Sequence, residues 1–229
     1  MTKVCRRLWM EFSKSLFPVL ALIGAAVFIA ASLFFRPAAL VEKRALIAPP
    51  PQLEYFSFGF QMPIADSLWI RAIQDMDYCE AKGEEGHCRN NSWLYQTLDT
   101  ISRLAPDFYQ TYSIGGVALS ILVSDVEGGA KILEKGTRVF PKKQRLLYLA
   151  GYHALYEEKD KKKAAYYYQK CAENGGTPWI YSLAAGLYDE TGERELALKI
   201  YEGLKDQDIS EALLERVREK LKLPAQLSQ

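Results

Sequence analysis

The stretch LAAGLYDETGERELALKIYEGL, residues 183–204, decides the fold, because its apolar residues follow a helical spacing on both sides of a short break. Thr191 and Gly192 form that break and predict a turn. The flanking segments are therefore expected to be two antiparallel helices. Gly186 lies inside the first helix, where glycine is about 1 kcal/mol less favourable than alanine. A glycine at this position is therefore expected to allow close packing that offsets the weaker helix.

A small residue followed by glycine recurs along the chain at a fixed interval. Gly116, Gly151 and Gly186 are spaced by 35 residues, and Pro106 and Pro141 keep the same step. Because glycine and proline both recur at the same 35-residue step, coincidence is a poor explanation. A period of this length is typical of a helical solenoid, in which each unit packs on its neighbours. The sequence therefore predicts an all-α fold of stacked helical hairpins.

This pattern resembles the tetratricopeptide repeat (TPR), a helix–turn–helix unit of about 34 residues. The residues of the last three units that match its consensus are Tyr112, Gly115, Gly116, Leu133 and Pro141, then Leu147, Ala150, Gly151, Ala164, Tyr168 and Cys171, then Ala185, Gly186, Tyr188, Gly192, Ala197 and Tyr201. The resemblance implies that Gly116, Gly151 and Gly186 lack a side chain so that the second helix of each hairpin can approach closely.

An apolar segment precedes the repeats. Residues 16–35 carry no charge, and a helix of twenty residues rises about 30 Å, enough to cross a bilayer. We predict an uncleaved transmembrane helix here in preference to a signal peptide, whose apolar core spans about 7 to 15 residues. The basic residues before the segment favour a cytoplasmic N-terminus; they are Lys3, Arg6, Arg7 and Lys14.

Two cysteines bear on the cellular compartment. Cys79 and Cys88 flank the polar insert EAKGEEGH, and beyond a membrane such a pair favours a disulfide in an oxidising compartment. There are two alternatives. One is a metal site formed by Cys79, His87 and Cys88, although adjacent His and Cys without a CxxC pair is poor ligand spacing. The other is that both cysteines are free thiols. The chain is similar to bacterial single-pass TPR proteins, which implies the inner membrane with a periplasmic C-terminal domain.

The complete prediction is an all-α chain: an N-terminal transmembrane helix, then a TPR-like helical-hairpin solenoid of about four repeats with a C-terminal capping helix. In the linker Phe56, Phe58, Phe60 and Met62 alternate with smaller or polar residues, which predicts an extended segment with one buried face. The expected parts are a cytoplasmic tail at 1–15, the membrane helix at 16–35, a Pro- and aromatic-rich extended linker at 36–63, a divergent first repeat with the Cys-flanked insert at 64–106, three repeats at 107–207, and the capping helix and tail at 208–229.

Composition and motifs favour binding over catalysis. A net charge of +1 gives no reason to expect nucleic acid, and the run KDKKKAA at 159–165 is interpreted as a solvated turn. The only histidines are His87 and His153, and the sequence has no GxSxG, HExxH, Walker or dinucleotide-binding motif. We therefore predict no enzymatic activity, no cofactor and no metal.

The predicted function is a membrane-anchored adaptor or scaffold that binds a protein or peptide in the periplasm. The alternative is a fixed structural subunit of a larger inner-membrane complex, docked through its transmembrane helix and linker. The TPR pattern implies a partner-binding groove formed by Tyr148, Tyr152, Tyr156, Ser113, Val117, Leu183 and Leu187. The three tyrosines are spaced by four residues and share one helix face. They are expected either to bind an apolar or aromatic segment or to fill the interface with the next repeat.

Overall fold

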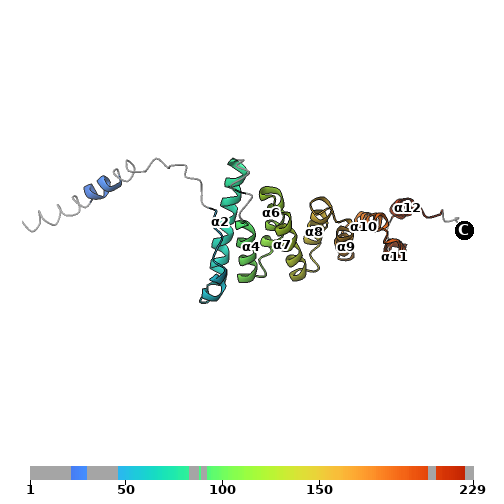
Figure 1. Cartoon of the computed structure of the whole chain (residues 1–229), viewed down its shortest axis with the longest axis horizontal. Coiled ribbons are helices and arrows are strands. Elements are labelled where there is room, and N and C mark those ends of the chain that lie inside the picture. Colours follow the sequence, from blue (N-terminus) through green and yellow to red (C-terminus); the bar gives the residue numbers. More distant parts are fainter. Residues whose placement is uncertain (1–21, 30–45, 83–87, 89–91, 206–209, 225–229) are drawn as a thin grey trace, which may run out of the picture. The chain divides into compact units, whose positions relative to one another are not determined.

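A computed structural model describes residues 22–29, 46–82, 88, 92–205 and 210–224. The chain divides into two compact units, residues 1–45 and 46–229. In the first unit residues 22–29 are helical with exposed side chains. The second unit holds the helical array, and Figure 1 shows its helices following one another in chain order.

The predicted membrane span requires a correction. Among the described residues, no helix is both long and apolar enough to cross a membrane. Residues 22–29 form the only described part of the expected span 16–35, and eight helical residues rise only about 12 Å. The rest of that span and the tail at 1–15 lie outside the described residues. For the residues that the structure describes, the supported fold class is an all-helical array.

All regular elements in the described part of the chain are helices. Besides residues 22–29, they are the 3₁₀ helix η1 (Pro51–Phe56) and the α-helices α2 (Gln61–Lys82), α4 (Trp93–Leu104), α5 (Tyr109–Ser113), α6 (Gly115–Val123), α7 (Val126–Val139), α8 (Gln144–Tyr156), α9 (Lys161–Glu173), α10 (Trp179–Glu190), α11 (Arg194–Lys205) and α12 (Glu211–Lys220).

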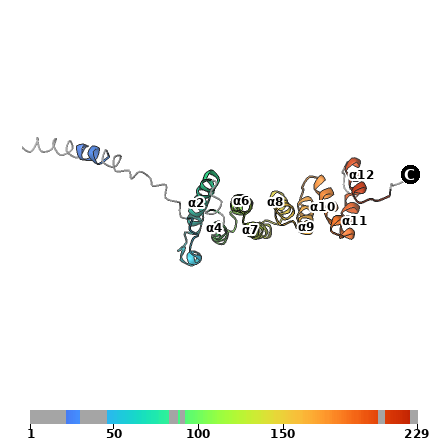
Figure 2. The same cartoon turned by 45° about the horizontal axis from the view of Figure 1, so that its top comes forward.

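The helices pack as successive hairpins. Helix α2 packs on α4, α6 on α7, α8 on α9 and α10 on α11, while α9 also contacts α10 of the next hairpin. Figure 2 shows α6, α8 and α10 on one side of the array and α7, α9 and α11 on the other. The buried core runs continuously through these contacts. The second unit is therefore a two-layered helical solenoid.

Two aspartates start second helices of the hairpins. The carboxylate of Asp125 accepts a hydrogen bond from the Gly128 amide at 2.8 Å, and that of Asp160 accepts one from the Lys163 amide at 2.9 Å. Each bond satisfies an amide that the first turn of a helix leaves unpaired. Residues 125 and 160 are also 35 apart, so the caps of α7 and α9 follow the glycine period.

The repeated glycines lie at close contacts, but their neighbours differ. A Cβ added at Gly116 would be 2.7 Å from Leu133 Cγ of α7, and one at Gly151 would be 2.9 Å from the Tyr168 ring of α9. Both neighbours belong to the second helix of the same hairpin. At Gly186 the nearest atoms are those of Lys220 on α12, at 2.9 to 3.0 Å. Gly186 therefore makes room for the last helix of the array rather than for α11.

Helix α12 covers the end of the array. It packs on α10 and α11, and its Val217, together with Leu221 just after it, is fully buried. The Arg194 guanidinium on α11 donates a hydrogen bond to the Leu221 carbonyl at 2.9 Å. These contacts shield the apolar face of the last hairpin, which otherwise would have no neighbour.

The segment before α2 is not an extended strand with one buried face. Residues 51–56 form η1, and α2 begins at Gln61. Phe56, Phe58, Phe60 and Met62 are all exposed, and Ser57 between them is buried. The large residues do alternate with smaller ones in the sequence. The chain turns here, however, and all four large side chains face solvent. Of the predicted linker 36–63, residues 36–45 lie outside the described part.

Cys79 of α2 and Cys88 form a disulfide in the structure, with a Cα–Cα distance of 5.9 Å. Both cysteines are buried against the first hairpin, and the Trp93 indole donates a hydrogen bond to the Cys88 carbonyl at 3.3 Å. His87, which the metal-site alternative requires, lies outside the described residues. The disulfide thus fastens the end of α2 to the beginning of α4.

Candidate functional site

Helix α8 carries Tyr148, Tyr152 and Tyr156, and the structure gives the three side chains different surroundings. The Tyr148 ring is half-buried and lies 5.6 Å from the Tyr168 ring and 6.3 Å from the Trp179 ring, measured between ring centroids. Trp179 begins α10 of the following hairpin. Tyr148 therefore helps to fill the junction between two hairpins, which is the second of the two roles expected for the row.

Tyr152 and Tyr156 extend the row onto an exposed surface. Their side chains are 46% and 50% exposed, and their rings are 4.5 Å apart with an angle of 39° between the planes. Successive turns of α8 bring the two rings together because the residues are four apart. We call Tyr152 and Tyr156 the tyrosine pair. Such a pair offers rigid apolar area together with two hydroxyl groups.

Tyr168 lies beneath this row and is almost completely buried. Burial raises the pKa of its hydroxyl above the usual range, and the nearby phenols of Tyr148, Tyr156 and Tyr152 raise it further. Tyr168 also packs against Gly151, as described above. The tyrosine pair is consequently supported by a neutral, close-packed layer.

The other residues expected in the groove are less accessible. Ser113 is buried, and its hydroxyl donates to the Tyr109 carbonyl at 3.2 Å within α5. Leu187 is also buried, whereas Val117 and Leu183 are partly exposed. Ser113 and Leu187 therefore serve the packing of their own helices. Of the expected groove residues, the tyrosine pair remains the most exposed. By the 35-residue step Val117 is equivalent to Tyr152 and Leu183 to Tyr148.

Sequence reasoning missed two isoleucines on the preceding hairpin. Ile114 and Ile121 are 50% and 63% exposed. Ile121 is 35 residues before Tyr156, so the repeat places it at the equivalent position of its own hairpin. The 35-residue step was the signal that could have found it. Ile121 and Tyr156 therefore occupy equivalent positions in adjacent hairpins, and both side chains are exposed.

A polar chain joins three helices near the tyrosine pair. The Ser120 hydroxyl on α6 and Nε2 of His153 on α8 are 2.5 Å apart, and His153 Nδ1 is 3.3 Å from a Glu158 carboxylate oxygen. When Nδ1 carries the ring proton, it donates to Glu158, and Nε2 then accepts from the Ser120 hydroxyl. Glu158 also accepts from Lys163 of α9 at 2.7 Å.

The order Ser120, His153, Glu158 matches that of a nucleophile, a base and an orienting acid, but the hydroxyl is not accessible. Ser120 is 7% exposed and His153 is 3% exposed. Gly129 of α7 lies directly over them: a Cβ there would be 2.5 Å from the Ser120 hydroxyl oxygen and 2.9 Å from His153 Nε2. The arrangement is suited to holding α6, α8 and α9 together, with α7 packed over it at Gly129.

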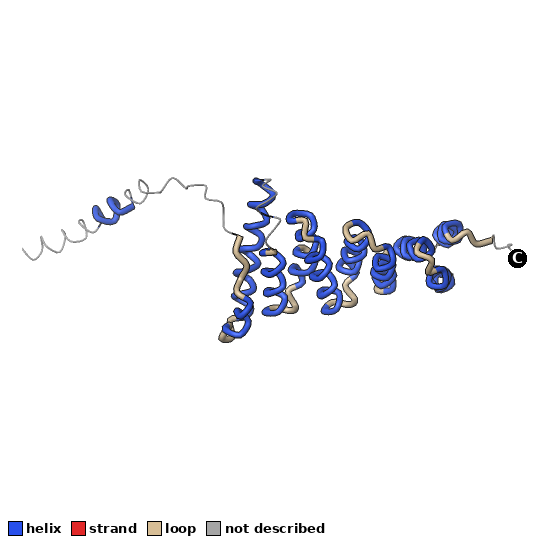
Figure 3. Tube along the Cα trace, in the orientation of Figure 1, coloured by secondary structure: helices blue, strands red, loops and turns tan. Residues whose placement is uncertain are grey.

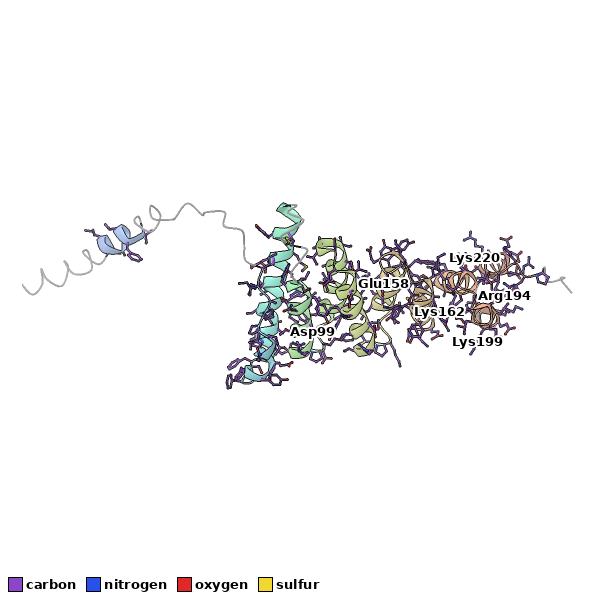
Figure 4. All side chains as sticks on the ribbon, in the orientation of Figure 1. Asp99, Glu158, Lys162, Arg194, Lys199 and Lys220 are labelled. Atoms are coloured by element: carbon purple, nitrogen blue, oxygen red, sulfur yellow. A yellow bond between two sulfur atoms is a disulfide. The ribbon has the colours of Figure 1, made fainter. Side chains whose placement is uncertain are left out.

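Three of the four lysines in the run at 159–165 are paired with acids of neighbouring elements. Lys161 contacts Glu190 at 2.8 Å, Lys162 contacts Glu193, and Lys163 contacts Glu158 at 2.7 Å. Glu190 and Glu193 belong to the next hairpin, so two of these pairs cross a repeat boundary. Figure 4 labels Lys162 and Glu158 in this region. The run contributes charge pairs along the array rather than a concentrated positive surface.

No protein-family model matches the chain, and no curated protein matches it. The assignment to the TPR family therefore stays a prediction from the glycine and proline spacing. The structure by itself defines the broader class: a solenoid of helical hairpins closed by a final helix.

Proposed function

We propose that the chain is a non-enzymatic scaffold that binds another protein, or a peptide segment of one, on the surface formed by the tyrosine pair and Ile121. The main support for the proposal is the geometry of the tyrosine pair. The ring centroids of Tyr152 and Tyr156 are 4.5 Å apart, while about half of each side chain remains exposed. Tyrosine is enriched at the centre of protein interfaces, and a helical solenoid provides an extended surface for a partner.

The partner chemistry follows from the side chains. The surface is apolar and aromatic, with phenolic hydroxyls as its polar groups, so it suits an uncharged segment rich in apolar or aromatic residues. The pairing of the 159–165 lysines with acids supports the further proposal that nucleic acid is not a partner. The enclosed position of Ser120 supports the absence of enzymatic activity, and we propose no cofactor or metal.

The TPR family and the periplasm are parts of the same proposal. The 35-residue period, together with the close contacts at Gly116 and Gly151, supports TPR-like hairpins. The disulfide between Cys79 and Cys88 supports an oxidising compartment, because such bonds are rare in reducing cytosol. For a bacterial protein that compartment is the periplasm.

Affinity capture with matched variants tests the proposal. Tagged full-length protein is expressed in its own cells as wild type, as Tyr152→Ser/Tyr156→Ser, and as Tyr166→Ser, and the bound proteins are identified by mass spectrometry. Tyr166 is the control because it is 51% exposed and lies on α9, in the other layer. We expect specific partners to be lost with the double variant and kept with Tyr166→Ser. Equal capture by all three forms would overturn the proposal.

A further inference from the structure

The most exposed apolar segment of the second unit is distant in sequence from the tyrosine pair. It lies between η1 and the first turn of α2, and Figure 3 shows it as the loop leading into the lower end of that helix. We call residues 55–62 the aromatic segment. Its large side chains and their exposed fractions are Tyr55 78%, Phe56 63%, Phe58 82%, Phe60 64% and Met62 56%.

The backbone of the aromatic segment is fixed while its rings face solvent. The Phe60 amide donates to the Ser57 carbonyl at 2.7 Å, and the buried Ser57 hydroxyl donates to the Glu54 carbonyl at 3.2 Å. Phe58 has φ 46° and Gly59 has φ 87°, left-handed values that a bulky residue such as Phe rarely adopts. The Phe56 and Phe58 rings contact each other, with centroids 6.4 Å apart. The turn therefore displays the rings instead of folding them onto the core.

Charge is absent along this surface. No charged residue occurs from 55 to 65, and the acid that precedes it, Glu54, is paired with Arg103 at 2.8 Å. Aromatic residues and Met are also enriched at the centre of protein interfaces, but there a polar rim usually surrounds them. Proteins that lie in the interfacial layer of a bilayer likewise insert Phe side chains and place Tyr at the headgroups.

We propose that the aromatic segment inserts into the interfacial layer of a lipid bilayer, with its rings among the acyl chains and the Tyr55 hydroxyl at the headgroups. This contact is a surface docking by a turn, not a span. It is independent of the tyrosine pair, because the two surfaces share no residue. It would hold the α2 end of the array against the membrane while α8 remains accessible to a partner.

The test uses residues 46–229, the second compact unit, so that any lipid binding observed comes from the helical array. This fragment contains the entire described core and is one of the two compact units, so we expect it to fold, and its own thermal melt checks this. It is mixed with vesicles of phosphatidylcholine and phosphatidylglycerol and floated on a density gradient. The variants are Phe56→Ser/Phe58→Ser/Phe60→Ser and, as a control, Tyr152→Ser/Tyr156→Ser. Thermal melts confirm that both variants keep the fold, which is expected because all five rings are exposed.

We expect the fragment and the control to float with the vesicles and the triple variant to lose about tenfold or more of its affinity, since aromatic burial supplies the binding. Binding should persist in high salt, because the inserted side chains carry no charge. Failure of the fragment to float, or equal flotation of the triple variant, would overturn the proposal. So would a concentration-dependent dimer that the triple variant abolishes, if it occurs without vesicle binding. None of these outcomes affects the tyrosine-pair proposal, which rests on partner capture.

Discussion

Gly151 of α8 lies against the Tyr168 ring of α9 so closely that a Cβ at position 151 would be 2.9 Å from two ring carbons. Tyr168 is 1% exposed, so its ring has little room to move away. The hairpin thus depends on the missing side chain. The weakening of helix propensity at glycine is offset by the close approach of the two helices.

Gly151→Ala should destabilise the protein despite alanine's better helix propensity. Overpacking of a tight core typically costs about 1 to 3 kcal/mol, which exceeds the propensity gain of about 1 kcal/mol. Gly203→Ala is the matched control, because no atom lies within 4 Å of a Cβ at that helical site. Urea unfolding should show Gly203→Ala unchanged or more stable and Gly151→Ala less stable. An increase for both would contradict the close packing at Gly151.

Gly186→Ala should behave differently from Gly151→Ala, although the two glycines are equivalent in the repeat. The atoms nearest to a Cβ at 186 belong to the Lys220 side chain, whose exposed end can rotate away. We expect no loss of stability and a gain of up to about 1 kcal/mol from helix propensity. Differential scanning calorimetry of the two variants side by side measures the difference in stability. A loss of stability in Gly186→Ala as large as that in Gly151→Ala would contradict this prediction.

The period of 35 residues predicted the hairpins and the tight contacts at Gly116 and Gly151, because those contacts repeat within each unit. It failed at Gly186, where the array ends and α12 takes the place of a following hairpin. The period-two pattern at 56–62 located a distinct segment, but alternation alone does not reveal whether any face is buried. The Ser120–His153–Glu158 chain was missed because its members come from different helices, and only the packed structure brings them together.

The disulfide should stabilise the first hairpin. Cys79 and Cys88 are nine residues apart, so the loop-closure contribution should be somewhat below the ~3 kcal/mol of a fifteen-residue loop. Cys79→Ala/Cys88→Ala should lower the free energy of unfolding by this order, and reducing agent should affect the wild type but not the variant. Mass analysis after alkylation without reduction provides the direct check. Modification of both cysteines in that experiment would show that the bond is absent.

Stability should fall in alkaline solution as buried tyrosines titrate. Burial raises the pKa of Tyr112, Tyr167, Tyr168 and Tyr188, so above the usual tyrosine pKa of about 10 the unfolded chain loses protons that the folded protein retains. The stabilisation is complete below that pH and is lost as the pH rises beyond it. Tyr168→Phe should make the decline shallower in urea unfolding between about pH 9 and 11.5. An identical slope in variant and wild type would mean that Tyr168 titrates normally.

Cys171 should be unreactive in the folded protein. Burial raises the pKa of its thiol, although a backbone hydrogen bond in α8 opposes the shift, and the side chain is 2% exposed. The thiolate is the reactive form, so alkylation at neutral pH should be slow and should accelerate on unfolding. The experiment uses Cys5→Ser protein so that only one thiol can react. Rapid alkylation in native buffer would show that α9 does not bury Cys171.

Site-specific photo-crosslinking in living cells can show whether a partner binds at the tyrosine pair. A benzophenone-bearing amino acid replaces Tyr156 in one strain and Tyr166 in another, two exposed tyrosines on opposite layers of the same hairpin. We predict discrete crosslinked proteins from position 156 and none of the same proteins from position 166. No adduct at 156, or the same adducts from both positions, would contradict the account.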